Sequence, residues 1–192
     1  MELDKINVKF FAEDSNGVPL TAFINIFHSW IQASDGDYND LADYSHMHAG
    51  PGILLIAHEA NISMDSTGNR LGFLYNRKQP LQGSNREKLR SIFRWALEHC
   101  CRIEEEPSLQ GRLRFRGNEA LFLVNDRLLA PNTEETFRAL RPDLEDVGRT
   151  LYGGTDFTLQ RQIDSKTRFS VQIKSATPFE IATLLENLTD QL

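Results

Sequence analysis

The chain has 192 residues, of which 40% are hydrophobic and 25% charged, and its net charge is −6. This composition is typical of an ordinary globular protein and excludes a disordered or fibrous one. The acidic charge is spread over both halves of the chain, which argues against DNA or RNA as a partner. No apolar run exceeds the length of Ile53–Ala57, whereas a membrane span needs about 20 residues. We therefore expect a soluble protein with one domain over residues 1–192 and with no nucleic-acid or membrane partner.

The two cysteines, Cys100 and Cys101, are neighbours near the end of a helical pattern. Successive helix positions point about 100° apart, so a disulfide between them would be strained. We expect two free thiols, one in the core and one near the surface, with a vicinal redox pair as the alternative. The acidic N-terminus, residues 1–5, lacks the basic start of a signal peptide. Both features predict a cytoplasmic protein.

Apolar spacing predicts the elements of the first half of the chain. Residues 6–11 alternate in polarity as a strand does, and an apolar stripe at helical spacing follows over 19–31. Three short strands are expected within 41–77, separated by turn-forming residues. A serine and a glutamate in capping-box spacing begin a helix over 84–101.

The second half of the chain has a simpler pattern. Two strands are expected within 113–124, around a turn at Gly117 and Asn118. A helix over 132–153 follows, and Pro142 is expected to kink or restart it. Two more strands of alternating polarity and a final helix complete the chain.

The order of expected elements is therefore β-α-β-β-β-α-β-β-α-β-β-α. Short connections between strands force antiparallel pairing, and strands with one polar face need cover on one side only. We predict an α+β fold, with a predominantly antiparallel sheet of six to nine strands and with helices mostly on one face. The ββα-ββα pattern in residues 111–192 is either an internal duplication or a coincidence.

Three of the five histidines lie in one segment, and two of them suggest a metal site. In a strand, His46 and His48 share a face, as metal-binding histidines on sheets often do. In the expected register, however, Glu59 lies about 13 Å from a position beside them, so no third ligand converges. The adjacent glycine–proline–glycine sequence leads into a strand and not into the helix that a phosphate loop requires. We predict no metal and no cofactor, with a site at His46 and His48 as the alternative.

Two hairpin registers lead to a candidate ligand site. If residues 49–52 are a four-residue turn, Asp43 shares a row with His58, and a turn at 65–70 places His58 opposite Arg77. We therefore predict that these three side chains lie in one row on neighbouring strands and on the same face. A carboxylate, an imidazole and a guanidinium so arranged could bind an anion or transfer a proton. The alternative is a structural polar ladder.

Two classes of function remain open. The first is a non-enzymatic binding or interaction protein for a small anionic ligand or a protein partner, favoured because no nucleophile motif is present. Its polar sheet face would carry Arg112, Arg114, Gln160, Gln162, Gln172 and Lys174. The second is a small enzyme, a hydrolase or lyase acting on an anionic metabolite. It would use Arg77 to hold the anion, His58 to move a proton and Asp43 to orient the imidazole. The sequence does not indicate the oligomeric state.

Three segments, Asp43–Glu59, Leu71–Arg77 and Asn125–Asn132, resemble a family of bacterial proteins of unassigned function. The similarity extends over nearly the whole chain. It implies a bacterial and cytoplasmic origin, and it implies no activity, cofactor or catalytic residue.

Overall fold

The computed structural model describes residues 1–13, 17–164 and 167–189. The strands in this part of the chain are β1 (Ile6–Ala12), β2 (Tyr38–Tyr44), β3 (Gly52–Ala57), β4 (Ala60–Asp65), β5 (Gly72–Arg77), β6 (Phe115–Val124), β7 (Phe157–Arg161) and β8 (Ser170–Ser175). The α-helices are α1 (Ala22–Ala33), α2 (Asn85–Glu104), α3 (Glu134–Leu151) and α4 (Ile181–Thr189). None of these helices has both the length and the apolar character needed to cross a membrane.

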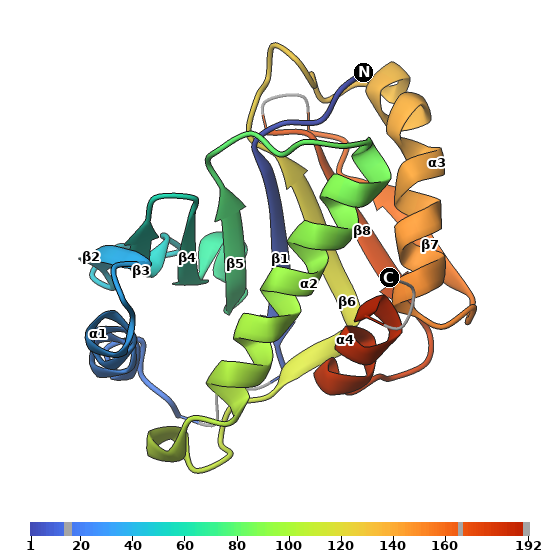
Figure 1. Ribbon diagram of the computed structural model, residues 1–192. Helices are drawn as coiled ribbons and strands as arrows, with labels where there is room; N and C mark the ends of the chain where they lie inside the picture. Colours follow the sequence, from blue (N-terminus) through green and yellow to red (C-terminus); the bar gives the residue numbers. More distant parts are fainter. Residues whose placement is uncertain (14–16, 165–166, 190–192) are drawn as a thin grey trace.

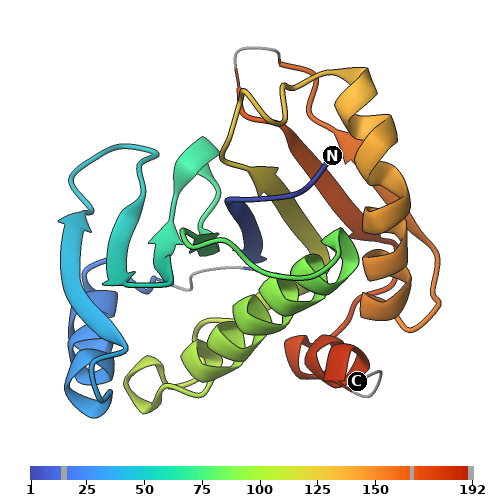
Figure 2. The same ribbon diagram turned by 45° about the horizontal axis from the view of Figure 1, so that its top comes forward.

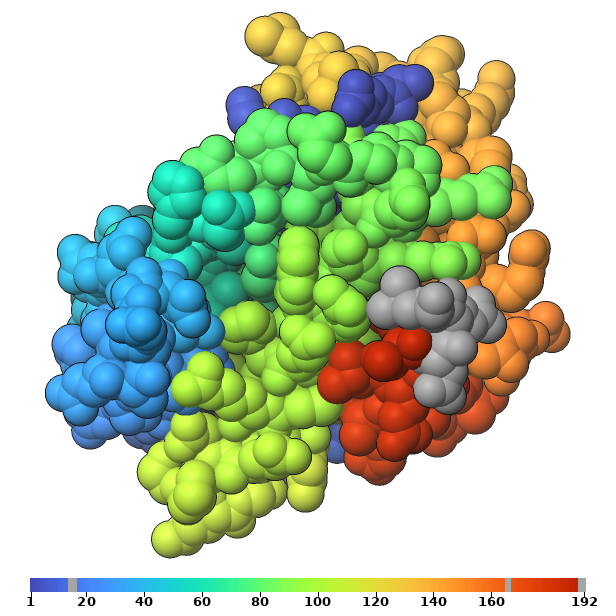
Figure 3. All heavy atoms as spheres, viewed as in Figure 1, coloured from blue at the N-terminus to red at the C-terminus, as the bar shows by residue number. Residues whose placement is uncertain are grey.

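All eight of these strands belong to one antiparallel sheet in the order β2-β3-β4-β5-β1-β6-β8-β7 (Figure 1). Helix α2 crosses one face of the sheet over β1 and β5, with α3 and α4 beside it (Figures 1 and 2). Helix α1 joins the same layer at β2 and β3, where the ring of Trp30 contacts the rings of Tyr38 and His99. Figure 3 views the molecule from this helical side. The predicted antiparallel α+β fold with helices on one face is confirmed.

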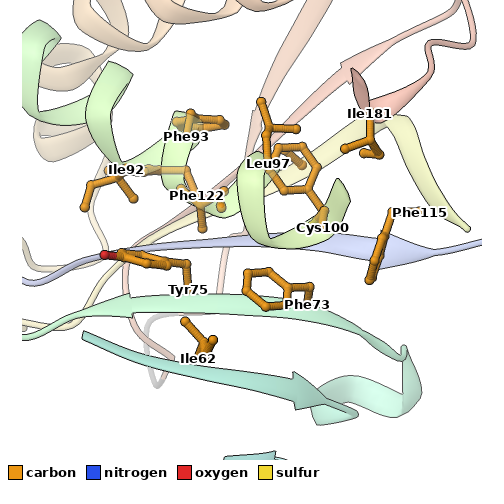
Figure 4. Packing of buried hydrophobic residues seen from close by; sticks show 14 of the residues in the cluster. Ile62, Phe73, Tyr75, Ile92, Phe93, Leu97, Cys100, Phe115, Phe122 and Ile181 are labelled. Carbon is orange, nitrogen blue, oxygen red and sulfur yellow. The ribbon is translucent and has the colours of Figure 1, made fainter. Parts of the chain in front are cut away.

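The hydrophobic core lies between the sheet and this helical layer. The apolar side chains of β1, Ile6, Val8 and Phe10, are buried there, and the Phe10 ring meets the Phe93 ring of α2 edge-on at 6.2 Å. Figure 4 shows residues of α2 packed over Phe73 and Tyr75 of β5. The alternation of β1 also points its odd-numbered residues to the opposite face of the sheet, which carries none of the four α-helices (Figure 1).

Helix α2 begins and ends as the sequence predicts. The Ser84 side chain accepts a hydrogen bond from the Glu87 amide, and the Glu87 carboxylate accepts one from the Ser84 amide, so the capping box is formed. Near the other end, Cys100 is buried and Cys101 is half-buried, and both thiols are free. The prediction of one core and one near-surface cysteine is confirmed.

The strand boundaries differ from the predicted ones in two places. The segment 41–77 was expected to hold three strands, but a tight turn at His58 and Glu59 divides its middle part into β3 and β4. Gly117 lies within β6 and not in a turn. The pairing of β6 with β1 slips there, from Phe10–Ala120 to Ala12–Phe115. A side chain at Gly117 would collide with the carbonyl oxygen of Phe179, so the glycine permits a close approach of the backbone.

The order of elements in residues 111–192 also differs from the predicted one. Residues 111–192 contain β6-α3-β7-β8-α4 and not two ββα units, because residues 115–124 form a single strand. Helix α3 passes through Pro142 without ending, so the proline does not restart it.

Candidate functional site

The predicted row of Asp43, His58 and Arg77 is not formed. Asp43 pairs with Ile53, whereas His58 lies five residues further along the chain, or about 16 Å away along an extended strand. The Asp43 side chain is exposed and accepts a hydrogen bond of 2.8 Å from the Ser45 amide. The prediction failed because the connection from β2 to β3 runs over 45–51, longer than the expected four-residue turn.

The second hairpin register was wrong by two residues, because Arg77 pairs with Ala60 and not with His58. His58 therefore lies beyond the end of β4, in the turn, with 77% of its side chain exposed. Arg77 faces the helical layer, donates to the Glu59 carboxylate and the Gln79 carbonyl, and lies over the ring of Trp95. His58 and Arg77 thus share Glu59 as a neighbour.

The histidines proposed as an alternative metal site lie outside the strands. Strand β2 ends at Tyr44, so His46 and His48 fall in the exposed turn that follows it and do not share a strand face. Among the described residues, no group of three histidine, cysteine, aspartate or glutamate side chains could hold a metal ion.

A groove of about 740 Å³ lies on the face of the sheet opposite the four α-helices. Its floor is formed by three half-buried leucines on the central strands, Leu74 of β5 and Leu121 and Leu123 of β6. Lys9 and Phe11 of β1 also line it, because they alternate with the core residues Val8 and Phe10. The turn between β4 and β5 lies at one end of the groove, and the loops after β6 and β7 lie at the other.

A buried ion pair fastens the β4–β5 turn to the floor of the groove. The ammonium group of Lys9 lies 2.6 Å from the Asp65 carboxylate and also donates to the carbonyl oxygens of Arg70, at 2.7 Å, and Thr67, at 3.3 Å. Burial lowers the pKa of Lys9, while the attraction of Asp65 opposes that shift. With three acceptors around it, this ammonium group has its hydrogen-bonding capacity filled and acts as a structural cation.

A second ion pair lies at the same end of the groove. The guanidinium of Arg70 donates two hydrogen bonds, of 2.7 and 2.8 Å, to the two carboxylate oxygens of Glu119. Gln172 donates to the same carboxylate, and the central guanidinium carbon of Arg70 lies 3.6 Å from the centre of the Phe11 ring. The hydrogen bond from Arg70 holds the pKa of Glu119 below its ordinary value.

The opposite end of the groove is built from two loops, and Asn132 helps to join them. The side-chain amide of Asn132 donates to the carbonyl oxygens of Gln162 and Asp164, at 2.9 Å each. Arg127 and Arg168 line this end. The polar residues at 125–133 also act as the turn and cap formers that they resemble in sequence, since Asp126 accepts two backbone amides and Thr133 caps α3.

The groove carries more positive than negative charge. Of the described residues that line it, Lys9, Arg70, Arg127 and Arg168 are cationic and Asp65 is acidic, and Arg70 is paired with Glu119. The whole chain has a net charge of −6. The groove is thus a local site of positive charge on an acidic protein, with an apolar floor between its two ends.

The predicted polar sheet face is correct in part. Gln160 pairs with Gln172, and Lys174 follows on the same face of β8, so these three residues share the helix-free side. Arg112 and Arg114 precede β6 instead, and Arg114 lies 3.2 Å from the carboxylate of Glu104.

Sequence reasoning did not identify Lys9, Phe11 or Arg70 as site residues. One signal was available, because the apolar alternation of β1 already places Lys9 on the polar face of that strand. The folding of the turn at 65–70 against that face had no such signal, since it depends on contacts between residues far apart in the chain. Comparison with known proteins found no matching family model and no similar curated protein or solved structure.

Proposed function

We propose that this protein binds a small anionic ligand in the groove on the helix-free face of its sheet, as a non-enzymatic binding protein of the bacterial cytoplasm. One observation carries the proposal: cationic side chains exceed carboxylates around an apolar floor, in a chain whose net charge is negative. A concave site with an apolar lining and a few placed charges is the usual form of a small-molecule site.

The anionic group of the ligand would lie at the loop end of the groove, which is the end formed by the loops after β6 and β7. Lys9 and Arg70 are each paired with a carboxylate, so their positive charge is largely compensated. The guanidinium of Arg168, by contrast, donates to the neutral side-chain oxygen of Asn125 at 3.3 Å. Replacing that weak contact by a bond to a carboxylate or phosphate would be favourable, because charge-assisted hydrogen bonds are about twice as strong as neutral ones.

Binding is favoured over catalysis by the chemistry of the groove. The hydrolase or lyase hypothesis required Asp43, His58 and Arg77 to meet, and they lie apart. Lys9, the buried amine of the groove, has three acceptors around it and is therefore unsuited to act as a base. The two free cysteines accord with a reducing compartment.

Isothermal titration calorimetry with dodecanoate tests the proposal, because this carboxylate combines an anion with an apolar chain. We expect saturable binding that weakens about tenfold in Arg168→Ala and weakens as salt is added. Arg149→Ala is the matched control, since Arg149 is an exposed arginine on α3, away from the groove. No measurable binding, or equal weakening by both substitutions, would exclude the groove as an anion site.

A further inference from the structure

Arg70 is held in one orientation by contacts on two of its sides. Its two hydrogen bonds to Glu119 lie along the edge of the planar guanidinium, and the Phe11 ring covers one of its faces at 3.6 Å. The Arg70 side chain is nevertheless 44% exposed. Glu119 occupies one edge of the guanidinium and Phe11 one of its faces, and Arg70 lines the groove.

The partners of Arg70 are themselves fixed. The Glu119 side chain is only 4% exposed and accepts a further hydrogen bond from Gln172, and Phe11 is buried. Arg70 has therefore already lost most of its rotamer freedom before any ligand arrives, so a ligand that stacks on it orders little more. We call this arrangement of the two residues the Arg70–Phe11 stack.

We propose that the Arg70–Phe11 stack receives an aromatic ring, so that the ligand of the groove is an aromatic or heteroaromatic anion. The ring would lie on the open face of the Arg70 guanidinium, and the acidic group would lie toward Arg168. This inference rests on the proposed function and narrows its ligand class. Guanidinium planes stack readily on aromatic faces, and because Glu119 compensates the charge of Arg70, its planar surface is what remains for recognition.

The dimensions of the groove also set how far apart the ring and the acidic group of the ligand must lie. Phe11 lies four residues along β1 from Asn7, and Asn7 pairs with Leu123 near the loop end. This separation is about 13 Å along a strand. The leucine floor fills the interval, so the ring and the acidic group of the ligand are separated by an apolar spacer.

Two carboxylates with the same number of carbon atoms test the inference. One is ω-phenylhexanoate, which carries a phenyl ring on its last carbon, and the other is dodecanoate. Burial of apolar surface alone favours the longer alkyl chain of dodecanoate. We expect ω-phenylhexanoate to bind about fivefold more tightly, as measured by isothermal titration calorimetry, because only its ring stacks on Arg70.

Substitutions at Arg70 and Phe11 test whether the preference for ω-phenylhexanoate comes from the Arg70–Phe11 stack. Arg70→Lys keeps the positive charge but removes the planar surface, so we expect it to abolish the preference and to leave dodecanoate affinity within about twofold. Phe11→Leu, which removes the supporting ring, should reduce the preference as well. Arg149→Lys, on the helical side, is the matched control and should change neither affinity.

The outcomes separate the two proposals. If dodecanoate binds as tightly as ω-phenylhexanoate or more tightly, the inference is wrong and the proposed anion site stands. A preference that persists in both Arg70→Lys and Phe11→Leu also overturns the inference. If neither carboxylate binds to the wild-type protein, the proposed function and the inference fail together.

Discussion

The ammonium group of Lys9 lies 2.6 Å from the carboxylate of Asp65, and only 4% of either side chain is exposed. Lys9 is in β1, at the centre of the sheet, and Asp65 ends β4, so the ion pair reaches across β5. Thr67 strengthens the arrangement through a hydrogen bond of 2.7 Å to the second carboxylate oxygen of Asp65. The pair therefore sets the position of the turn that carries Arg70.

Lys9→Met is expected to destabilise the fold by about 3–5 kcal/mol, because it leaves the charge of the buried Asp65 carboxylate without a cationic partner. The double variant Lys9→Met with Asp65→Leu should recover most of this loss, since no uncompensated charge then remains. Equilibrium unfolding in urea measures both changes. Lys5→Met, which removes a largely exposed lysine 3.6 Å from Asp126, is the control and should cost less than about 1 kcal/mol. A Lys9→Met protein as stable as the control variant would contradict the structural role of the pair.

Local sequence patterns predicted individual elements of the fold correctly, whereas the register between strands was not predicted. The alternation of β1 and the capping box of α2 are local patterns, and both predicted their elements correctly. Register is different, because a shift of two residues preserves which side chains face the core. The predicted pairing of β4 with β5 therefore satisfied the apolar pattern equally well, yet it placed His58 opposite Arg77 when the true partner is Ala60.

The length of the connection between β2 and β3 was also predicted wrongly. The connection between β2 and β3 contains a glycine and a proline that are typical of a tight turn, but residues 45–51 form a longer excursion. Its position depends on contacts with a distant segment, since the amide and hydroxyl of Ser66 both donate to the carbonyl of Gly50. The groove depends on similar long-range contacts, which explains why its residues could not be identified from their sequence neighbours.

Asn7→Leu is expected to stabilise the protein by about 1 kcal/mol. Asn7 is fully buried on β1, and neither its side-chain oxygen nor its nitrogen has a hydrogen-bond partner among the described residues. A buried amide without partners costs about 1–3 kcal/mol relative to an apolar group of similar shape. Urea unfolding measures the change, and Asn132→Leu is the opposite control, because it removes hydrogen bonds that join two loops. A clear loss of stability in Asn7→Leu would show that the amide is satisfied in solution.

His99 is expected to make the fold less stable in acid. It is half-buried, and its Nδ1 lies 2.7 Å from the Trp95 carbonyl, so Nδ1 donates while Nε2 accepts from the Tyr38 hydroxyl at 3.2 Å. Burial lowers the pKa of His99 in the folded state. As pH falls below about 6.5 the unfolded chain therefore takes up a proton before the folded one does, and stability is lost.

Unfolding experiments between neutral pH and about pH 5 test this dependence. His99→Phe retains a ring against Phe73 but removes the titrating group. The centres of the Phe73 and His99 rings lie 5.8 Å apart. Its stability should be lower at neutral pH and should fall less steeply in acid. His28→Gln is the control at an exposed histidine and should keep the wild-type slope. Identical slopes in the wild-type protein and His99→Phe would assign the acid sensitivity to other groups.

The two cysteines are expected to be unreactive in the folded protein. Burial raises the pKa of Cys101 to about 11 and that of Cys100 well above its ordinary value, and nearby Glu104 adds to both shifts. Because the thiolate is the nucleophile, alkylation by iodoacetamide at neutral pH should be far slower than for free cysteine. Addition of denaturant should expose both thiols and restore ordinary rates, as followed by intact-protein mass spectrometry. Rapid alkylation of the folded protein at Cys101, or a disulfide forming in air without loss of the fold, would instead support the vicinal redox pair. Cys101→Ser would then identify which thiol reacts, since Cys100 is buried in the core.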